Sequence, residues 1–259
     1  MRYKGYKTAI LILSALVIIE ALLLVKSGIR HPKKAVKVTV PLPKIAIVID
    51  DWGYNVRNLD ILDRIRYPIT VSVLPNLSYS EEIVRQLHEK GVEIIMHLPM
   101  EPHERYNLEQ NTIMTSMDEK TISGIIAGDL ESLSYVKGVS NHMGSKATED
   151  PGLMAIVFKI LKGKHLYFLD SFVTSESICL DLANKIDLRF AKRDVFLDNE
   201  EEPEYIVEQL EKLKKRAKAY GYAIGIGHDR RVTLEVLKKE MPRLEKEGYK
   251  FVFVSELTR

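Results

Sequence analysis

Short apolar runs alternate with amphipathic stretches along the chain from residue 44 onward. Runs with so few charges are typical of strands that are buried on both faces of a parallel sheet, and the stretches between them show the period of helices. The expected strands are 45–49, 69–74, 92–97, 135–140, 166–170, 188–191 together with 194–198, 222–228 and 251–255. The expected helices are 80–91, 118–133, 150–164, 201–221 and 233–248. This alternation predicts an α/β fold, a distorted (β/α) barrel of about seven parallel strands, with a doubly wound open sheet as the alternative.

The N-terminal pattern is different, because residues 8–25 are largely apolar and carry a single charge, Glu20. At ~1.5 Å per residue a helix of this length nearly spans a hydrocarbon core of ~30 Å. We expect an uncleaved membrane anchor or signal-anchor over residues 1–30, since no small-x-small cleavage site follows the segment. Positive charges flank it on both sides and would favour a cytoplasmic domain, whereas the short N-terminal tail favours export, which is our expectation.

The remaining chain divides into a basic, proline-bearing linker over residues 31–43 and one domain over residues 44–259. The length of this domain suits a single sizeable core. The formal net charge is only +2 and the charges are intermixed, so no nucleic-acid partner is expected. A single cysteine, Cys179, excludes an internal disulfide framework.

Polar residues gather where the expected strands end. They are Asp50, Asp51, His97, Asn141, His142, Asp170, Ser171 and His228. In a parallel barrel all strands end on the same face, so these side chains are expected to converge on one site. Any one of them alone reads more simply as a helix cap or a structural histidine, but three of the seven histidines share this position.

Imidazole and carboxylate groups together suit a divalent cation, most of all zinc with three protein ligands and one open position. A second carboxylate beside the ligands can act as general base. Nucleophilic catalysis fits less well, because Ser171 lacks a G-x-S-x-G elbow and Cys179 lies in an apolar, helix-like stretch. No glycine-rich phosphate loop is present in the sequence.

Six blocks in order resemble the divergent polysaccharide deacetylases, an offshoot of the metal-dependent polysaccharide deacetylase superfamily. They are IVIDDWGY, GVEIIMHLPMEP, GVSNHMGSKAT, YFLDSFVT, RDVFLD and AIGIGH. The resemblance covers roughly residues 42 to 257 and implies a distorted (β/α) barrel. It also implies hydrolysis of acetyl groups on polysaccharides by attack of a metal-bound water.

The resemblance assigns roles to several of these residues. Asp50 matches the general base and Asp51 matches a metal ligand. His97 matches the first histidine of a His-x-x-x-His-Pro block, but Glu101 stands at the second. The expected ligands are therefore Asp51, His97 and His142, with Glu101 as alternative ligand or as a partner of the ligands.

His228 matches the general acid of the family. An aspartate that orients it is expected, and Asp170 or Asp194 fits this role, with Asp170 preferred. Asn141 and Arg193 are candidate substrate or oxyanion contacts, although Arg193 can instead pair with Asp194 or Asp198. Trp52, and near it Tyr54 and Tyr106, are candidates for stacking on a sugar.

Two functions stay open at this point. The first is a zinc-dependent deacetylase acting on N-acetylated or O-acetylated polysaccharide, or a peptidoglycan-like glycan, of the cell envelope. The second is a glycan-binding or scaffold protein on the same barrel that has lost turnover, which Glu101 favours because it replaces a histidine. Retention of Asp50 and His228 favours the enzyme, since binding alone needs neither a base nor an acid.

Overall fold

The computed structural model describes residues 3–28, 41–104 and 107–259. It divides into two compact units, Met1–Val40 and Pro41–Arg259. Residues 29–40, which make up most of the expected linker, and Tyr106, an expected sugar contact, lie outside the described residues.

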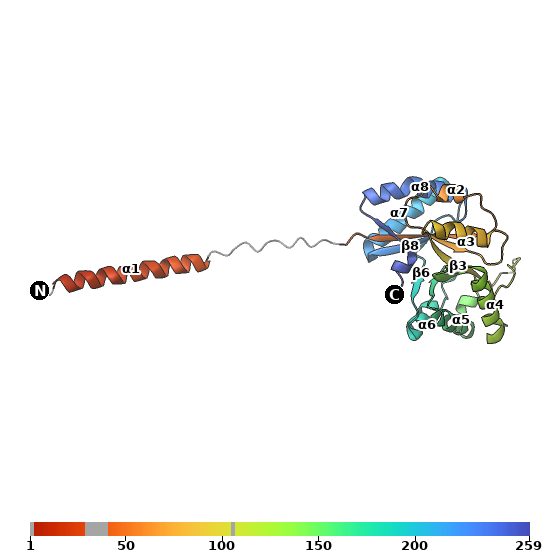
Figure 1. Ribbon diagram of the computed structural model, residues 1–259, viewed down its shortest axis with the longest axis horizontal. Coiled ribbons are helices and arrows are strands. Elements are labelled where there is room, and N and C mark those ends of the chain that lie inside the picture. The colour runs from red at the N-terminus through yellow and green to blue at the C-terminus, as the bar shows by residue number, and fades with distance from the viewer. Residues whose placement is uncertain (1–2, 29–40, 105–106) are drawn as a thin grey trace. The chain divides into compact units, whose positions relative to one another are not determined.

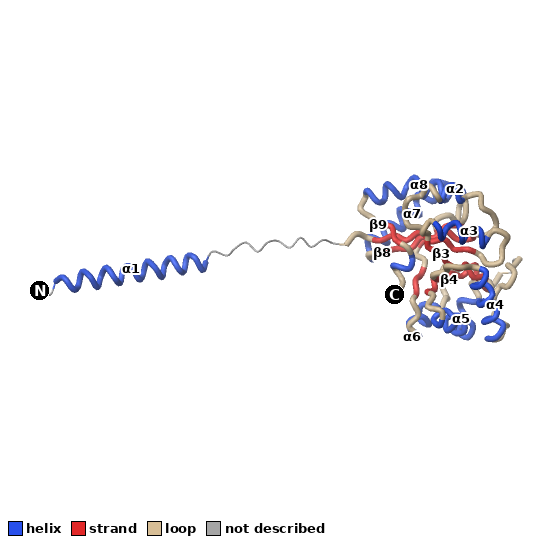
Figure 2. The backbone as a smooth tube through the Cα atoms, viewed as in Figure 1, coloured by secondary structure: helices blue, strands red, loops and turns tan. Residues whose placement is uncertain are grey.

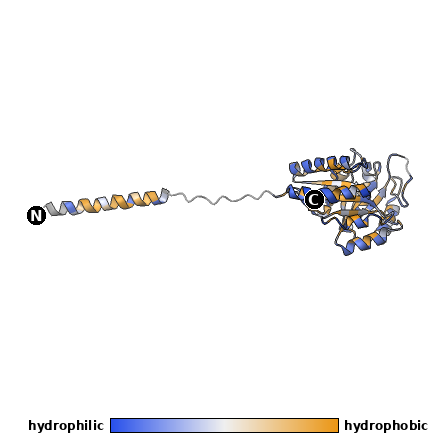
Figure 3. Cartoon of the chain, turned by 90° about the horizontal axis from the view of Figure 1, so that it is seen from above, coloured by the Kyte–Doolittle hydropathy of each residue, from blue (hydrophilic) through white to orange (hydrophobic). Residues whose placement is uncertain are grey.

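The N-terminal unit contains one helix, α1 (Tyr3–Gly28). Its segment Tyr6–Ser27 has 22 residues and a mean hydropathy of 2.8, so it is long and apolar enough to cross a membrane. Figure 3 shows apolar residues along most of the length of this helix. These properties fit a membrane anchor, and a signal sequence near an N-terminus has them too.

The second unit alternates strands with helices and contains the five expected helices in their order, with two further short helices over residues 59–62 and 179–186 (Figure 1). Its strands are β1 (Lys44–Trp52), β2 (Thr70–Val73), β3 (Glu93–Met100), β4 (Gly138–Met143), β5 (Tyr167–Asp170), β6 (Phe190–Lys192), β7 (Val195–Phe196), β8 (Tyr222–His228) and β9 (Lys250–Val252). Its helices are α2 (Leu59–Leu62), α3 (Ser80–Glu89), α4 (Glu119–Ser132), α5 (Pro151–Gly163), α6 (Cys179–Ile186), α7 (Pro203–Tyr220) and α8 (Arg231–Lys246), with short 3₁₀ turns η1 (Ala147–Glu149) and η2 (Val254–Glu256).

Local chemistry sets the helix ends. Asp118 and Asp150 are N-caps whose carboxylates accept the backbone N–H of Thr121 and Leu153, each at 2.8 Å. Gly221 ends α7 in the left-handed region at φ 85°, where a Cβ would be unfavourable.

The strands form one parallel sheet with the order β6-β5-β4-β3-β2-β1-β8-β7, and β9 pairs with the first residues of β1. Strands lie in the interior and helices lie outside them (Figure 2). The inner faces of β1, β3, β5 and β8 pack in one cluster although these strands are not all neighbours, so the sheet curls around its own core. It does not close among the described strands, because β6 and β7 share no ladder. The predicted distorted (β/α) barrel is confirmed, and the doubly wound open sheet is wrong.

Each strand alternates between two cores. On β1, Ile45, Ile47 and Ile49 pack outward against the helices, whereas Ala46 and Val48 pack inward. Residues 188–198, expected as one unit, instead form β6 and β7 at the two edges of the curled sheet. The strand expected from residue 135 begins only at Gly138, because Tyr135 is left-handed at φ 66°.

The inner layer leaves no room at Gly138, where an added Cβ would lie 2.5 Å from the ring of Tyr167. We expect Gly138→Ala to lower the free energy of unfolding by about 1–3 kcal/mol through overpacking. Gly128→Ala is the control, because nothing lies within 4 Å of its added Cβ in α4. The control should raise stability by about 0.5–1 kcal/mol, and urea denaturation of the detergent-solubilised protein measures both. Equal stability of the two variants would contradict the inner packing.

Candidate metal centre

Four inward-facing positions at the carboxyl ends of strands carry ionisable side chains. They are Asp50 on β1, His97 on β3, His142 on β4 and His228 on β8. Because residues two apart share a face, each continues the inward row of its own strand. The parallel sheet then brings the four together at one end, as the sequence predicts.

Asp51 reaches the same place through an irregular backbone. In a regular strand Asp50 and Asp51 would point to opposite faces. Asp51 instead has φ 66°, and the register between β1 and β2 slips between Ile49 and Trp52. This bulge turns the second carboxylate towards the first, so that His97 Nε2 lies 3.2 Å from Asp51 Oδ1 and 3.7 Å from Asp50 Oδ2.

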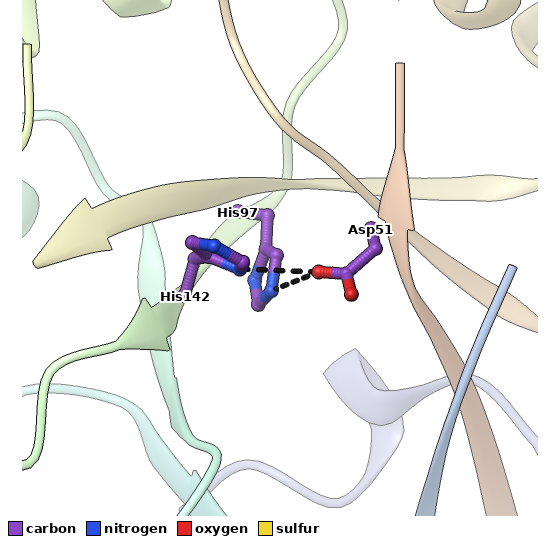
Figure 4. A group of neighbouring side chains, drawn as sticks. All are labelled: Asp51, His97 and His142. Carbon is purple, nitrogen blue, oxygen red and sulfur yellow. Dashed lines mark hydrogen bonds and ion pairs between the residues drawn. The ribbon is translucent and has the colours of Figure 1, made fainter. Parts of the chain in front are cut away.

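Asp51, His97 and His142 converge on one point (Figure 4). The Nδ1 atom of His142 lies 3.1 Å from Asp51 Oδ1, and one donor atom of each residue lies within 4.8 Å of the others. Two imidazoles and one carboxylate in this arrangement fit a divalent transition metal with a position left open. The structure thus brings together the three expected ligands.

The charged groups of this site change one another's pKa values. Burial opposes ionisation of Asp51, but hydrogen bonds from His142 and His97 outweigh it and hold the pKa of this carboxyl below its usual range. Burial would lower the pKa of His97, but the Asp50 and Asp51 carboxylates raise it above its ordinary value. The Asp51 carboxylate and the charged form of the His97 ring therefore stabilise each other.

Asp50 differs from Asp51 in its surroundings. Its side chain is 2% exposed, and its Oδ1 atom has no hydrogen-bond partner. Burial raises the pKa of Asp50, and the charge of Asp51 adds to this effect. A buried carboxylate with a free oxygen beside three candidate metal ligands is suited to accept a proton.

His228 is held by Asp198, a residue that we did not expect in this role. The ring Nδ1 lies 2.8 Å from Asp198 Oδ1, while the other carboxylate oxygen accepts the His228 backbone N–H and the Thr233 hydroxyl. Burial opposes the charged ring, but the hydrogen bond and charge of Asp198 outweigh it and raise the pKa of His228. The alternation of β7 would have indicated Asp198, because Phe196, two residues earlier, faces inward.

The expected partners of His228 lie elsewhere. Asp170 lies two residues after Phe168 on β5 and, like it, faces outward. Its carboxylate accepts the Phe172 N–H and the Ser177 hydroxyl, both at 2.7 Å. Asp194 accepts the Ile224 N–H and pairs with a guanidinium. Among the described carboxylates, the partner of His228 is therefore Asp198, which corrects the expectation of Asp170 or Asp194.

Residues 47–258 match the family described as divergent polysaccharide deacetylase. The chain belongs to this family. The chain is 35% identical over 196 residues to the protein YibQ of Escherichia coli (strain K12), which covers 76% of this chain and 61% of that one. It thus spans less than two thirds of the length of that relative.

Solved structures share the fold of the domain. ATU2773 from Agrobacterium tumefaciens has a TM-score of 0.81 at 20% identity, over 85% of this chain and 90% of that chain. The catalytic domain of a peptidoglycan N-acetylglucosamine deacetylase from Eubacterium rectale has a TM-score of 0.51 at 13% identity, over 83% and 92%. A family 4 acetyl xylan esterase from Clostridium thermocellum, in complex with a cobalt ion, has a TM-score of 0.50 at 19% identity, over 83% and 89%. At these identities the likeness shows the fold.

In this member of the divergent polysaccharide deacetylase family, Glu101 bonds to residues other than the three candidate ligands. Its carboxylate accepts the backbone N–H of Thr115 at 2.6 Å and pairs with Lys146 Nζ at 2.7 Å. Burial opposes ionisation, but the bonds from Lys146 and Thr115 lower the pKa of Glu101. His142, and not Glu101, therefore completes the converging group.

Two expected substrate contacts are buried instead. Trp52 is 0% exposed and cannot stack on a sugar. Asn141 is 1% exposed, and its amide accepts the Ser171 N–H and donates to the Met143 carbonyl, so it ties the ends of β4 and β5 together. Both expectations are corrected for the same reason: these side chains serve the packing of the barrel end.

Arg193 is half-buried, whereas Tyr54 is exposed. Arg193 donates from Nε to the Ser171 carbonyl and from Nη2 to the Phe172 carbonyl, each at 2.6 Å. Its guanidinium lies 3.6 Å from the centre of the Phe196 ring. It does not pair with Asp194 or Asp198 among the described ion pairs. Tyr54 is 49% exposed and donates its hydroxyl to Glu109.

Asp198→Asn removes the charge that raises the pKa of His228. We expect the pKa of His228 to fall, because burial then acts without its counterion. Histidine NMR titration of the full-length protein in detergent measures this shift. Asp194→Asn is the matched control, and it should leave the His228 titration unchanged. An unchanged or raised pKa of His228 in Asp198→Asn would contradict the assignment.

Proposed function

We propose that the chain is a metal-dependent hydrolase that removes acetyl groups from N-acetylated or O-acetylated polysaccharide of the cell envelope. One observation carries the proposal: Asp51, His97 and His142 converge on one point, with a free oxygen of Asp50 and the His228 ring beside it. Glycan binding alone would not require a buried base and a separately held acid next to a cation site.

Asp51, His97 and His142 would hold the metal, and we propose zinc because imidazole and carboxylate donors suit it. When bound, zinc lowers the pKa of a water molecule and polarises a carbonyl oxygen. The cobalt ion in the Clostridium thermocellum esterase supports a divalent metal in this fold. It belongs to that protein, so the metal of this chain is an inference from its own donor atoms.

Asp50 would act as the general base. Its carboxylate lies 3.7 Å from the Nε2 atom of His97, and burial raises its pKa. A carboxylate whose conjugate acid is less acidic than usual accepts a proton from the attacking water more readily. We propose that the proton moves to Oδ1, the oxygen without a partner.

His228 would act as the general acid. Asp198 raises the pKa of His228, which favours the charged ring that can donate from Nε2. The proton would go to the leaving nitrogen of an amide or the leaving oxygen of an ester. Asp198 itself accepts three further hydrogen bonds, from His228, Thr233 and, through its carbonyl, Arg230, so the acid is held in one orientation.

The N-terminal helix would hold the domain on the exported side of a membrane. This location would put it beside envelope glycans, and the Eubacterium rectale structure supports peptidoglycan as one substrate class for the fold. Lys26 follows the apolar core of α1 and does not decide the orientation.

Asp50→Asn tests the proposal directly. In zinc-loaded full-length protein in detergent, we expect acetate release from N-acetylated or O-acetylated glycan oligomers to fall by a factor of about 10²–10⁴, because the base is lost. Zinc content, measured by mass spectrometry, should stay at one per chain. Chelation should abolish acetate release, and added zinc should restore it.

Asp129→Asn is the control, since Asp129 is a 1% exposed carboxylate in α4 whose hydrogen-bond partner is Asn76 and not a residue of the metal centre. It should keep the acetate release of the unchanged protein. Stoichiometric zinc without acetate release from any envelope glycan would instead favour the glycan-binding protein. Acetate release that survives Asp50→Asn would exclude Asp50 as the base.

A further inference from the structure

Two serine side chains lie inside the barrel below the metal centre. Ser72 on β2 and Ser140 on β4 face inward, and both are 0% exposed. These two strands flank β3, which carries His97. Hydroxyl groups in an apolar interior are unfavourable unless they are hydrogen-bonded, so both serines are expected to have hydrogen-bond partners there.

The two hydroxyls form a continuous row of hydrogen bonds between His97, a proposed metal ligand, and Asp50, the proposed base. The Ser140 Oγ atom lies 2.8 Å from His97 Nδ1 and 2.7 Å from Ser72 Oγ. The Ser72 hydroxyl is in turn a hydrogen-bond partner of the Asp50 carboxylate, whose pKa this bond lowers against the larger effect of burial. The four groups therefore run in the order His97, Ser140, Ser72 and Asp50.

The number of hydrogens on each group fixes the direction in which these hydrogen bonds run, that is, which group donates and which accepts. An ionised Asp50 can only accept, so Ser72 donates its one hydroxyl hydrogen to Asp50. Ser72 then accepts from Ser140, which has used its own hydrogen and must accept from the His97 ring. His97 Nδ1 therefore carries a hydrogen. Nε2, which donates to Asp51 Oδ1 at 3.2 Å, is then the nitrogen left to bind a metal in place of its own hydrogen.

We propose that Ser140 and Ser72 are positioning residues that set the tautomer of His97 for metal binding and link it to the orientation of Asp50. This inference rests on the proposed function, because it assigns the serines a purpose only if His97 binds a metal. A ring nitrogen that is tied by a second hydrogen bond presents the other nitrogen in a fixed direction, and loss of such a bond typically weakens metal affinity.

This row of hydrogen bonds also explains why the two oxygens of the Asp50 carboxylate have different surroundings. Ser72 approaches the carboxylate from inside the barrel, while Oδ1 has no partner. A base held on one side by a hydroxyl keeps its other oxygen aimed in a constant direction. The same two serines therefore orient a ligand and the base.

Zinc titration of the full-length protein in detergent tests the inference. Ser140→Ala should weaken zinc affinity by about 10–100-fold, and Ser72→Ala should weaken it less because Ser140 still accepts from the ring. Ser80→Ala is the matched control: Ser80 is 1% exposed and its hydroxyl donates to the Leu74 carbonyl at 2.6 Å. The control should keep the zinc affinity of the unchanged protein.

A second measurement needs no substitution. In ¹⁵N-histidine NMR spectra of the full-length protein in detergent, His97 Nδ1 should carry a proton both without zinc and with it. Zinc should be bound through Nε2. An unprotonated Nδ1, or unchanged zinc affinity in Ser140→Ala, would overturn the inference. Failure of the unchanged protein to bind zinc would instead overturn the proposed function, so the two failures are distinguishable.

Discussion

The structure of the site depends on one unfavourable juxtaposition, two neighbouring carboxylates turned to the same side of a strand. A regular strand would separate Asp50 and Asp51 across the sheet, but the left-handed backbone at Asp51 (φ 66°) brings both to His97. Left-handed backbone at a residue other than glycine costs about 1–3 kcal/mol, and two carboxylates that both lie beside His97 repel each other when ionised. A bound cation would relieve the repulsion, which gives the backbone strain a physical reason.

The rest of the barrel supplies what surrounds this pair. Parallel strands end on one side, and the two-residue alternation decides which side chains face inward there. His97, His142 and His228 have inward parity and reach the pair, whereas Asp170 has outward parity and bonds to its own loop. Groups that could act on a substrate therefore lie at a strand end and face inward, whereas groups at a strand end that face outward hold the fold.

Much of this arrangement could be predicted from the sequence. The strand-helix alternation predicts the barrel, and the strand-end positions predict that Asp51, His97 and His142 converge. Other features depend on tertiary packing that no local pattern shows. Trp52 follows the acidic pair like a rim residue, but the bulge directs it into the core. Asp198 was overlooked as the partner of His228 because β6 and β7 were expected as one strand, and only their separation to opposite sheet edges brings Asp198 beside β8.

The proposed metal centre can be tested most directly by locating zinc in crystals of the full-length protein from anomalous scattering at the zinc edge. We expect one zinc ion bound by the Asp51 carboxylate, His97 Nε2 and a His142 ring nitrogen, each at about 2.0–2.2 Å. Zinc bound elsewhere, or no zinc between Asp51 and His97 at saturating concentration, would contradict it.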